Sequence, residues 1–415
     1  MQQQIAQEAE NSGNLKKMFY PSALWTTSFQ SGDVFSPRNS VVGMFPARLE
    51  CLYRFALVFV ILTECSSNHV GDVTARILLK NWRRKAEEQR ARFFNRLPKN
   101  VESSYTTPEV IRNRGYPVET HHVTTDDGYI LELHRIPPQS STGPKSVVLL
   151  IHGVLESSGT WLVNPSSRSL AILLASQSYD VWLGNYRGNK YARKHTTLNP
   201  KKAHFWKFSW DEIGDHDIPA IINYILKETR QSKLSYIGHS LGCGVFFIAM
   251  IKHPELNAKI DAMVGLAPLS SFANFTTALF RILAPFGKLF EEIIPLVGSN
   301  YLMGTSVPVI AQFAQNYAAG EIFQAYDYGR KGNLMRYGST KPLEYDLRKV
   351  TAPVYVFSGG NDRIVTPKDV DWLLTQLGNL KASTRIGNYN HLDFLWGTDV
   401  KEKLYDQVIA LLPPP

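Results

Sequence analysis

The chain of 415 residues is 44% hydrophobic and 20% charged, a composition that supports one large buried core and excludes a disordered polymer. Its net charge of +9 does not predict a nucleic-acid partner, because the densest basic stretch, residues 80–96, is interrupted by Glu87 and Glu88 and has no zinc-finger or basic-region spacing. A mild attraction to anionic lipid surfaces suits this charge better.

The first segment with a recognisable pattern is residues 52–62, which are apolar except for Arg54. These eleven residues would span only ~16 Å as a helix, about half a bilayer. Arginines precede or open the segment and small or polar residues follow it, as in a secretory signal. We therefore interpret residues 44–67 as a signal peptide and predict no stable transmembrane segment and a secreted or lysosomal protein. A short membrane-associated or buried helix is the alternative.

A signal peptide normally lies at the extreme amino terminus, and Met44 would place this one there. Residues 1–43 are polar, without helix or strand periodicity, so we interpret them as an artefactual or alternative extension. Cys51 and Cys65 flank the apolar segment, so its removal leaves Cys243 alone and no intradomain disulfide is expected. No cluster of Cys or His has metal-ligand spacing, and the sequence predicts neither a metal site nor a cofactor.

Regular patterning begins near Pro108, after a polar and basic linker, residues 68–107. A β-hairpin is predicted over 121–134, because Asp127-Gly128 supplies a turn between two alternating strands. The following elements read as strands alternating with helices, which predicts an α/β fold with a mostly parallel central sheet and helices on both faces. Strands are expected at 146–151, 179–184, 234–237, 262–267, 354–357 and 383–386, and helices near 170–175, 215–228, 241–251 and 400–412.

Residues 269–345 do not follow this alternation. They are long for a connection, rich in Phe, Leu and Ile, and broken by prolines into short helices. We interpret them as a helical cap inserted into an α/β domain that spans 108–415, suited to an apolar substrate that must leave water before it reacts. Ordinary helical packing over the core is the alternative.

The strongest motif is Gly238-His239-Ser240-Leu241-Gly242, between a predicted strand and a predicted helix. Such a turn places the central residue in strained backbone geometry and presents Ser240 above the sheet, as in the nucleophile elbow of α/β hydrolases. The alternative is a tight turn with an idle serine.

A serine hydroxyl needs a base to take its proton, and the base needs an acid to orient it. In α/β hydrolases these follow the nucleophile in the order acid, then histidine. Asp362 follows the strand 354–357, and His391 is the one histidine after it. Asp362 could instead cap a turn; the rival acids Asp369 and Asp371 fall in the next helical stretch.

Two backbone amides are expected to bind the oxyanion of the tetrahedral intermediate, where each donor lowers the barrier by about 3–4 kcal/mol. The residue after the nucleophile, Leu241, provides one amide, and Val154, in the loop after strand 146–151, provides the other. We expect His152 to brace that loop, and Asp393 to have a structural role.

Several longer segments resemble the acid lipases, the family of gastric lipase and lysosomal acid lipase with their arthropod relatives. The resemblance runs from about Pro108 to the carboxyl terminus and implies hydrolysis of neutral-lipid esters, a cap with a lid, and the triad Ser240, Asp362 and His391. Two departures are Leu241, where the family usually has Gln, and the single Cys243, where some relatives have a disulfide. The segments are RGYPVETHHVTTDDGYILELHRIP (114–137), HGVLESSGTWLVN (152–164), YDVWLGNYRGNKYAR (179–193), FWKFSWDEIGDHDIPA (205–220), YIGHSLG (236–242), SGGNDRIV (358–365) and HLDFLWG (391–397).

The leading hypothesis is a serine lipase that acts on triacylglycerols or sterol esters at an oil–water or membrane interface. A non-enzymatic lipid carrier on the same fold, and an esterase or acyltransferase for smaller soluble esters, are the alternatives. Asn274-Phe275-Thr276 is a glycosylation acceptor, consistent with secretion.

Overall fold

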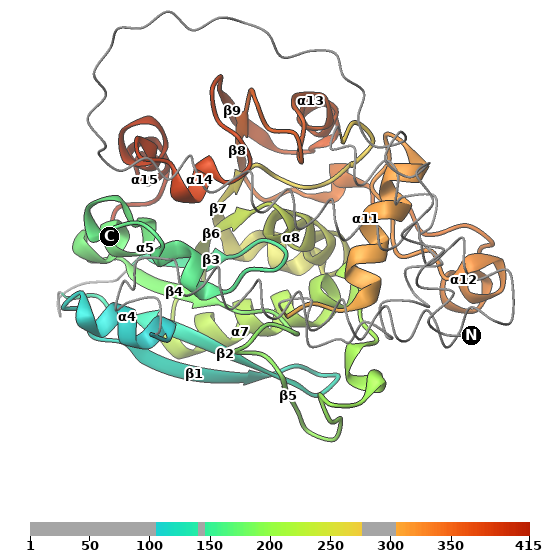
Figure 1. The fold of residues 1–415 in the computed structure, drawn as a ribbon, viewed down its shortest axis with the longest axis horizontal. Helices are drawn as coiled ribbons and strands as arrows, with labels where there is room; N and C mark the ends of the chain where they lie inside the picture. Colours follow the sequence, from blue (N-terminus) through green and yellow to red (C-terminus); the bar gives the residue numbers. More distant parts are fainter. Residues whose placement is uncertain (1–104, 140–145, 276–303) are drawn as a thin grey trace, which may run out of the picture. The chain divides into compact units, whose positions relative to one another are not determined.

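The structure, a computed structural model, describes residues 105–139, 146–275 and 304–415 (Figure 1). The predicted extension 1–43, the signal peptide 44–67 and nearly all of the linker 68–107 lie outside the described residues.

A mixed β-sheet forms the centre of the described part of the chain. Its strand order is β1-β2-β4-β3-β6-β7-β8-β9, with β5 beside β2. The predicted hairpin is β1 and β2, which pair antiparallel from Glu119 opposite Arg135 to Thr124 opposite Ile130. Neighbouring strands from β4 to β9 are parallel. The strands are β1 Glu119–Thr124, β2 Tyr129–Ile136, β3 Val147–Ile151, β4 Asp180–Gly184, β5 Lys194–His195, β6 Leu234–His239, β7 Ile260–Leu266, β8 Val354–Gly359 and β9 Leu380–Ile386.

The central strands β3, β4 and β6 are buried at every position, as expected of parallel strands covered on both faces. The register pairs Ile151 of β3 with Gly238 of β6, and Leu266 of β7 with Phe357 of β8. The loops that follow β3, β6 and β8 therefore leave the same edge of the sheet, the carboxyl edge at which open α/β sheets bind ligands.

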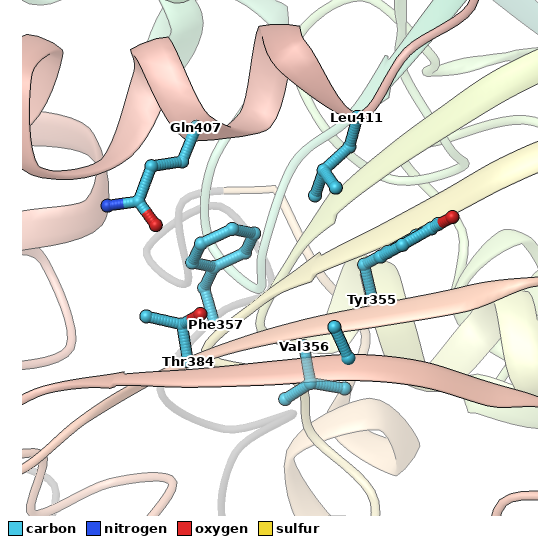
Figure 2. A pocket seen from close by; sticks show the side chains of 7 residues that line it. Tyr355, Val356, Phe357, Thr384, Gln407 and Leu411 are labelled. Atoms are coloured by element: carbon cyan, nitrogen blue, oxygen red, sulfur yellow. The ribbon is translucent and has the colours of Figure 1, made fainter.

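One face of the sheet is covered by α5 (Leu170–Ser176), α14 (Asp393–Trp396) and α15 (Asp406–Ala410) (Figure 1). A small pocket of about 90 Å³ lies between β8, β9 and α15. Figure 2 shows Gln407 and Leu411 on the helical side of this pocket, opposite Phe357 and Thr384. None of the predicted site residues lines it.

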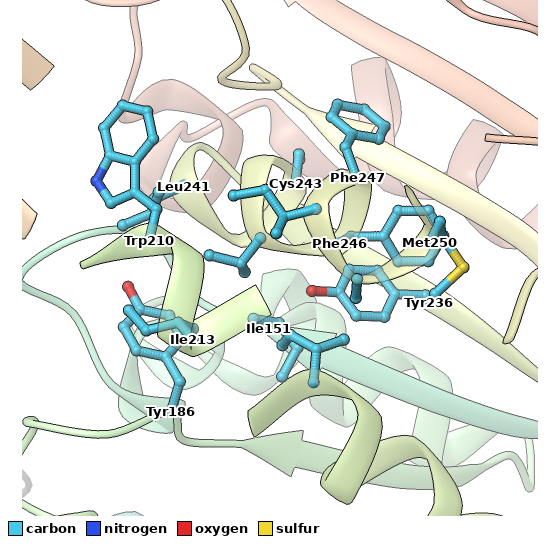
Figure 3. Packing of buried hydrophobic residues seen from close by; sticks show 14 of the residues in the cluster. Ile151, Tyr186, Trp210, Ile213, Tyr236, Leu241, Cys243, Phe246, Phe247 and Met250 are labelled. Carbon is cyan, nitrogen blue, oxygen red and sulfur yellow. The ribbon is translucent and has the colours of Figure 1, made fainter. Parts of the chain in front are cut away.

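The other face is covered by α7 (Ile218–Thr229) and α8 (Leu241–Lys252). Figure 3 shows the apolar packing here, with Phe246 of α8 beside Tyr236 of β6 at a ring-centroid distance of 4.6 Å. Further elements are α4 Thr107–Asn113, α6 Trp210–Glu212, α13 Pro367–Gln376, and the 3₁₀ helices η3 Ser158–Leu162, η4 Ser166–Arg168, η5 Ala203–Trp206, η7 Pro254–Lys259 and η9 Leu347–Lys349.

Two predicted helices differ from the structure in the same way. The helix expected over 215–228 starts as a π-helix, η6 (Ile213–Asp217), and continues as α7; the last helix is a π-helix, η10 (Lys401–Tyr405), followed by α15. The wider turn of η6 accompanies an inward-facing Asp217, whose carboxylate accepts hydrogen bonds from Arg187. Apolar periodicity does not encode such a contact.

Between β7 and β8, the described part of the insertion contains α11 (Val307–Ala319) and α12 (Gly329–Tyr337). The buried carboxylate of Asp211 anchors it, accepting hydrogen bonds from Gln312 of α11 and from the Tyr345 hydroxyl. Within the described residues no helix has the length and apolar character needed to cross a bilayer.

Candidate active site

Ser240 lies in the turn between β6 and α8. Its backbone angles, φ 53° and ψ −117°, are unfavourable for a residue with a side chain, and its amide donates to the Leu266 carbonyl at 2.9 Å. A Cβ at Gly242 would lie 2.5 Å from the Ile151 carbonyl oxygen, and one at Gly238 would lie 3.0 Å from the Cys243 amide nitrogen. Gly242 therefore lets the turn pack against the end of β3, and Gly238 lets it pack against the start of α8.

Asp362 lies in the loop after β8 and is buried. Its Oδ1 accepts hydrogen bonds from the amides of Ile364 and Val365 at 2.8 and 3.0 Å. These two donors fix the carboxylate so that Oδ2 points to His391. Asp362 thus does both of the things considered for it: Oδ1 caps the turn, and Oδ2 is bonded to His391.

His391 lies between the other two residues. Its Nδ1 is 2.8 Å from Asp362 Oδ2, and its Nε2 is 2.9 Å from Ser240 Oγ. An ionised carboxylate is only an acceptor, so Nδ1 donates to Asp362 and the unprotonated Nε2 accepts the serine hydroxyl. The structure brings the three residues predicted from sequence into one hydrogen-bonded chain.

The two predicted oxyanion donors belong to the first residue of α8 and to the loop that follows β3. Leu241 is the first residue of α8, where an amide has no carbonyl to bond within its own helix. Val154 follows Gly153, whose carbonyl oxygen accepts hydrogen bonds from His152 Nδ1 at 2.8 Å and from the Tyr186 hydroxyl at 2.6 Å. Both bonds hold the loop that carries the Val154 amide.

His152 braces this loop as a neutral ring. Burial lowers the pKa of His152 to about 4, against the opposing effects of its bond to Gly153 and of Glu156. Its Nδ1 donates to the Gly153 carbonyl and its Nε2 lies 3.0 Å from the side-chain amide of Asn189. The loop is thus held without a net charge at this position.

The rival acids have other partners. Asp369 accepts hydrogen bonds from the backbone and side-chain amides of Asn274, and Asp371 pairs with Arg385. Asp393 accepts from the Asn390 amide at 2.7 Å, a structural contact in the loop that carries the histidine. The side-chain amide of the predicted glycosylation site, Asn274, is thus engaged with Asp369.

Two residues at the site, the buried His239 and the partly buried Glu156, have no part in the sequence prediction. His239 Nδ1 lies 3.4 Å from Glu156 Oε1, and His239 Nε2 lies 3.0 Å from the backbone oxygen of His391. Glu156 Oε2 accepts the Gly153 amide at 2.9 Å. The available signals were a histidine inside the elbow motif and an acid three residues after Gly153 in the oxyanion loop.

Among the described residues, one group of side chains lies close enough together to act as ligands of a metal ion: Asp126, Asp127 and His216. Asp127 is occupied by Arg187, at 2.6 and 2.8 Å, and His216 Nδ1 bonds Asp126 at 2.7 Å. This group therefore consists of an ion-pair network. The absence of a metal or cofactor stays a prediction.

Comparison with known proteins gives the family. A family model described as the alpha/beta hydrolase fold matches residues 146–398, and one described as a partial alpha/beta-hydrolase lipase region matches residues 107–165. Gastric triacylglycerol lipase from Bos taurus is 36% identical to this chain over 375 residues, 77% of this chain and 94% of the relative. This chain belongs to the α/β-hydrolase lipase family.

Two further lipases from distant animals agree. Lipase member K from Homo sapiens is 36% identical, covering 75% of this chain and 92% of its own, and Lipase 1 from Drosophila melanogaster is 36% identical, covering 76% and 81%. The predicted fold and the resemblance to acid lipases are thus confirmed. The protein is a lipase and a carboxylic ester hydrolase, which sets aside the carrier hypothesis.

Proposed function

We propose that this lipase hydrolyses triacylglycerols with Ser240 as nucleophile, His391 as general base and Asp362 as the acid that orients the histidine. One observation carries the assignment: His391 Nε2 lies 2.9 Å from Ser240 Oγ while its Nδ1 lies 2.8 Å from Asp362 Oδ2. The substrate class is supported by relatives named gastric triacylglycerol lipase.

In the first half-reaction, Ser240 Oγ attacks the ester carbonyl carbon as its proton passes to His391 Nε2. Asp362 stabilises the resulting imidazolium, and its two backbone donors hold the carboxylate in place. The amides of Leu241 and Val154 would bind the negative oxygen of the tetrahedral intermediate. The imidazolium then returns its proton to the leaving alcohol, which leaves an acyl ester on Ser240.

In the second half-reaction, a water molecule attacks the acyl carbon and gives its proton to His391. Collapse of the second tetrahedral intermediate releases the fatty acid and returns the proton to Ser240. Leu241 contributes through its backbone amide, so the departure from Gln at this position leaves the oxyanion contact intact.

We propose that the enzyme works at a lipid–water interface. Leu334, Met335 and Leu343, on and beside α12, are 55%, 85% and 47% exposed, and the exposed Arg330 and Lys331 lie on the same helix. Exposed apolar side chains next to basic ones suit an interface that carries negative charge.

A secreted or lysosomal location is proposed from the sequence pattern of residues 44–67. Amino-terminal sequencing of the protein recovered from expressing cells tests this idea. A mature chain that begins before Leu52 would contradict it.

The proposed function is tested with Ser240→Ala, a fluorophosphonate label and two substrates, an emulsified long-chain triacylglycerol and a soluble short-chain ester. We expect the unchanged protein to be labelled and to favour the emulsion, and Ser240→Ala to lose labelling and turnover with an unchanged melting temperature. Turnover by folded Ser240→Ala refutes the nucleophile. A preference for the soluble ester refutes the interfacial substrate and favours the small-ester alternative.

A further inference from the structure

Glu156 and His239 take no part in the bond-making steps, yet they form a largely buried ion pair beside Ser240. The His239 side chain is 1% exposed and the Glu156 side chain 16%. The His239 and His391 rings lie 4.9 Å apart between centroids, with their planes at 44°. A buried charged group costs several kcal/mol to desolvate, so its presence at the nucleophile calls for a physical explanation.

The pair is best described as an imidazolium and a carboxylate. His239 Nε2 faces the carbonyl oxygen of His391, and Nδ1 faces the carboxylate of Glu156. Both groups are acceptors, so a ring with both nitrogens protonated donates a hydrogen bond from Nε2 and pairs its charge with Glu156 through Nδ1, whereas a neutral ring would leave one nitrogen lone pair facing an oxygen. The contact to Glu156, at 3.4 Å, is an ion pair and is longer than a good hydrogen bond.

The pKa values agree with this protonation state. Burial lowers the pKa of His239, but the attraction of Glu156 and the bond to His391 outweigh it, so the net shift is upward. Burial raises the pKa of Glu156, and His239 more than compensates, so its net shift is downward. The other ionisable groups that act on the pair are Asp362, which favours the imidazolium, and His152, which is neutral.

The pair connects the two loops whose relative position decides the chemistry. Through Oε2, Glu156 holds the Gly153 amide of the oxyanion loop at 2.9 Å. Through Nε2, His239 holds the backbone of the general base at 3.0 Å. The 152–157 loop follows β3 and the 387–392 loop follows β9, so no single element contains both.

We propose that Glu156 and His239 are positioning residues, a charged clasp that holds the oxyanion loop and the His391 loop in register across Ser240. The inference rests on the proposed function of the triad and adds two residues that act on it through others. Because reacting groups must be placed within a fraction of an ångström, loss of the clasp slows the reaction without removing a reacting group.

The variants Glu156→Ala and Glu156→Gln separate this role from general stability. Glu156→Ala opens the clasp, and kcat on the soluble ester should fall about 10- to 100-fold with KM nearly unchanged. Glu156→Gln keeps an acceptor for the Gly153 amide and a donor for a neutral His239, so most of that loss should be recovered. Rates are expressed per serine titrated with the fluorophosphonate, which corrects for misfolded protein.

The double variant Glu156→Ala/His239→Gln tests whether the two residues act as one unit. Its kcat should match that of the slower single variant, because residues that act through one link are not additive. Glu119→Ala is the matched control, because Glu119 also pairs with a histidine, His121 at 3.1 Å, but on the edge strand β1. It should leave kcat unchanged.

Nitrogen-15 spectra of labelled histidines give a readout that a purely structural role would not change. In the unaltered protein at pH 7, His239 should be doubly protonated while His152 carries one proton. In Glu156→Gln at the same pH, His239 should become neutral.

Three results overturn the clasp: full kcat in folded Glu156→Ala, additive losses in the double variant, or a neutral His239 in the unaltered protein. If the unaltered protein neither binds the fluorophosphonate nor hydrolyses esters, it is the proposed function that fails. An active, labelled protein with any of the three results rejects the clasp alone.

Discussion

The triad and the cluster around Arg187 both bury ionisable groups, but they satisfy them differently. Arg187, 1% exposed, donates to Asp217 and to Asp127 through five hydrogen bonds and ion contacts of 2.6–2.8 Å. Its guanidinium also lies 3.9 Å above the Tyr129 ring. Each charged group in this cluster has a partner of opposite charge, since one guanidinium pairs with two carboxylates, and the cluster joins the β1–β2 turn to the start of α7.

The triad leaves its last member available to a second molecule. Asp362 accepts hydrogen bonds from two amides and His391, but Ser240 donates its one proton to His391 and keeps its oxygen lone pairs for the proposed attack. Backbone strain at Ser240 is tolerated here, as it is at many functional sites. A cluster in which every charged group has its partner is therefore structural, whereas a hydrogen-bonded chain that ends in a hydroxyl with free lone pairs is suited to reaction.

The variant Asp362→Asn, which alters the triad, should have the largest effect on kcat. In Asp362→Asn, the amide group can donate to His391 Nδ1, so the proton moves to Nε2 and the ring can no longer accept from Ser240. We expect kcat to fall by about 10⁴-fold with little change in melting temperature. A loss below tenfold, measured on a soluble ester, would show that Asp362 does not orient the histidine.

The variant Arg187→Met disrupts the structural cluster instead. Arg187→Met leaves the buried Asp217 carboxylate without its cation, and we expect the free energy of unfolding in urea to fall by about 3–5 kcal/mol, with kcat per titrated serine retained. Arg348→Met is the control, because Arg348 pairs with Asp346 at the surface, 78% exposed, and its loss should not measurably change stability. Equal stability of the two variants would contradict a structural role for the cluster.

A third buried carboxylate, that of Asp211, differs from both clusters because it accepts hydrogen bonds from the neutral side chains of Gln312 and Tyr345. Changes to it should have the smallest effects. Burial, with the nearby charge of Glu212, raises the pKa of Asp211 to about 6. The folded state therefore binds this proton more tightly than the unfolded chain, so the stability from protonated Asp211 is full below about pH 4 and is lost as pH rises through about 6.

Tyr345→Phe tests this state, because it removes a donor 2.9 Å from Asp211 Oδ1. The loss of unfolding free energy should be about 1–3 kcal/mol at pH 8, where the acceptor is charged, and smaller at pH 4.5. Tyr405→Phe is the control, since the Tyr405 hydroxyl donates to the neutral Phe394 carbonyl and its loss should cost the same at both pH values. An equal cost of Tyr345→Phe at the two pH values would show that Asp211 does not titrate in this range.

Much of the fold and of the site could be predicted because the signals are local. Continuous apolar runs marked the buried strands, and Ile218, Ile221, Ile222 and Ile225 at helical spacing are all fully buried in α7. The elbow glycines are needed for contacts with the adjoining strand and helix. Strand ends in a parallel sheet meet at one edge, so acids and histidines after strands were sound candidates.

Contacts between side chains that come from distant parts of the chain could not be predicted in this way. Glu156 and His239 are separated by 83 positions, and Arg187 bonds acids on two other elements. The π-helices η6 and η10 interrupt helices whose apolar spacing is regular. The spacing of apolar residues along the chain carries no information on which side chains from distant positions in the sequence will contact each other.

By itself, the sequence determined the family and the order of the elements and predicted which serine, acid and histidine react, because each depends on short motifs and apolar patterns. Only the tertiary structure decided which charged groups pair with one another, and that Glu156 and His239 link the loop after β3 to the loop that carries His391. Such pairs depend on distances of about 3 Å between atoms far apart in the chain, and folding of the whole sheet sets those distances.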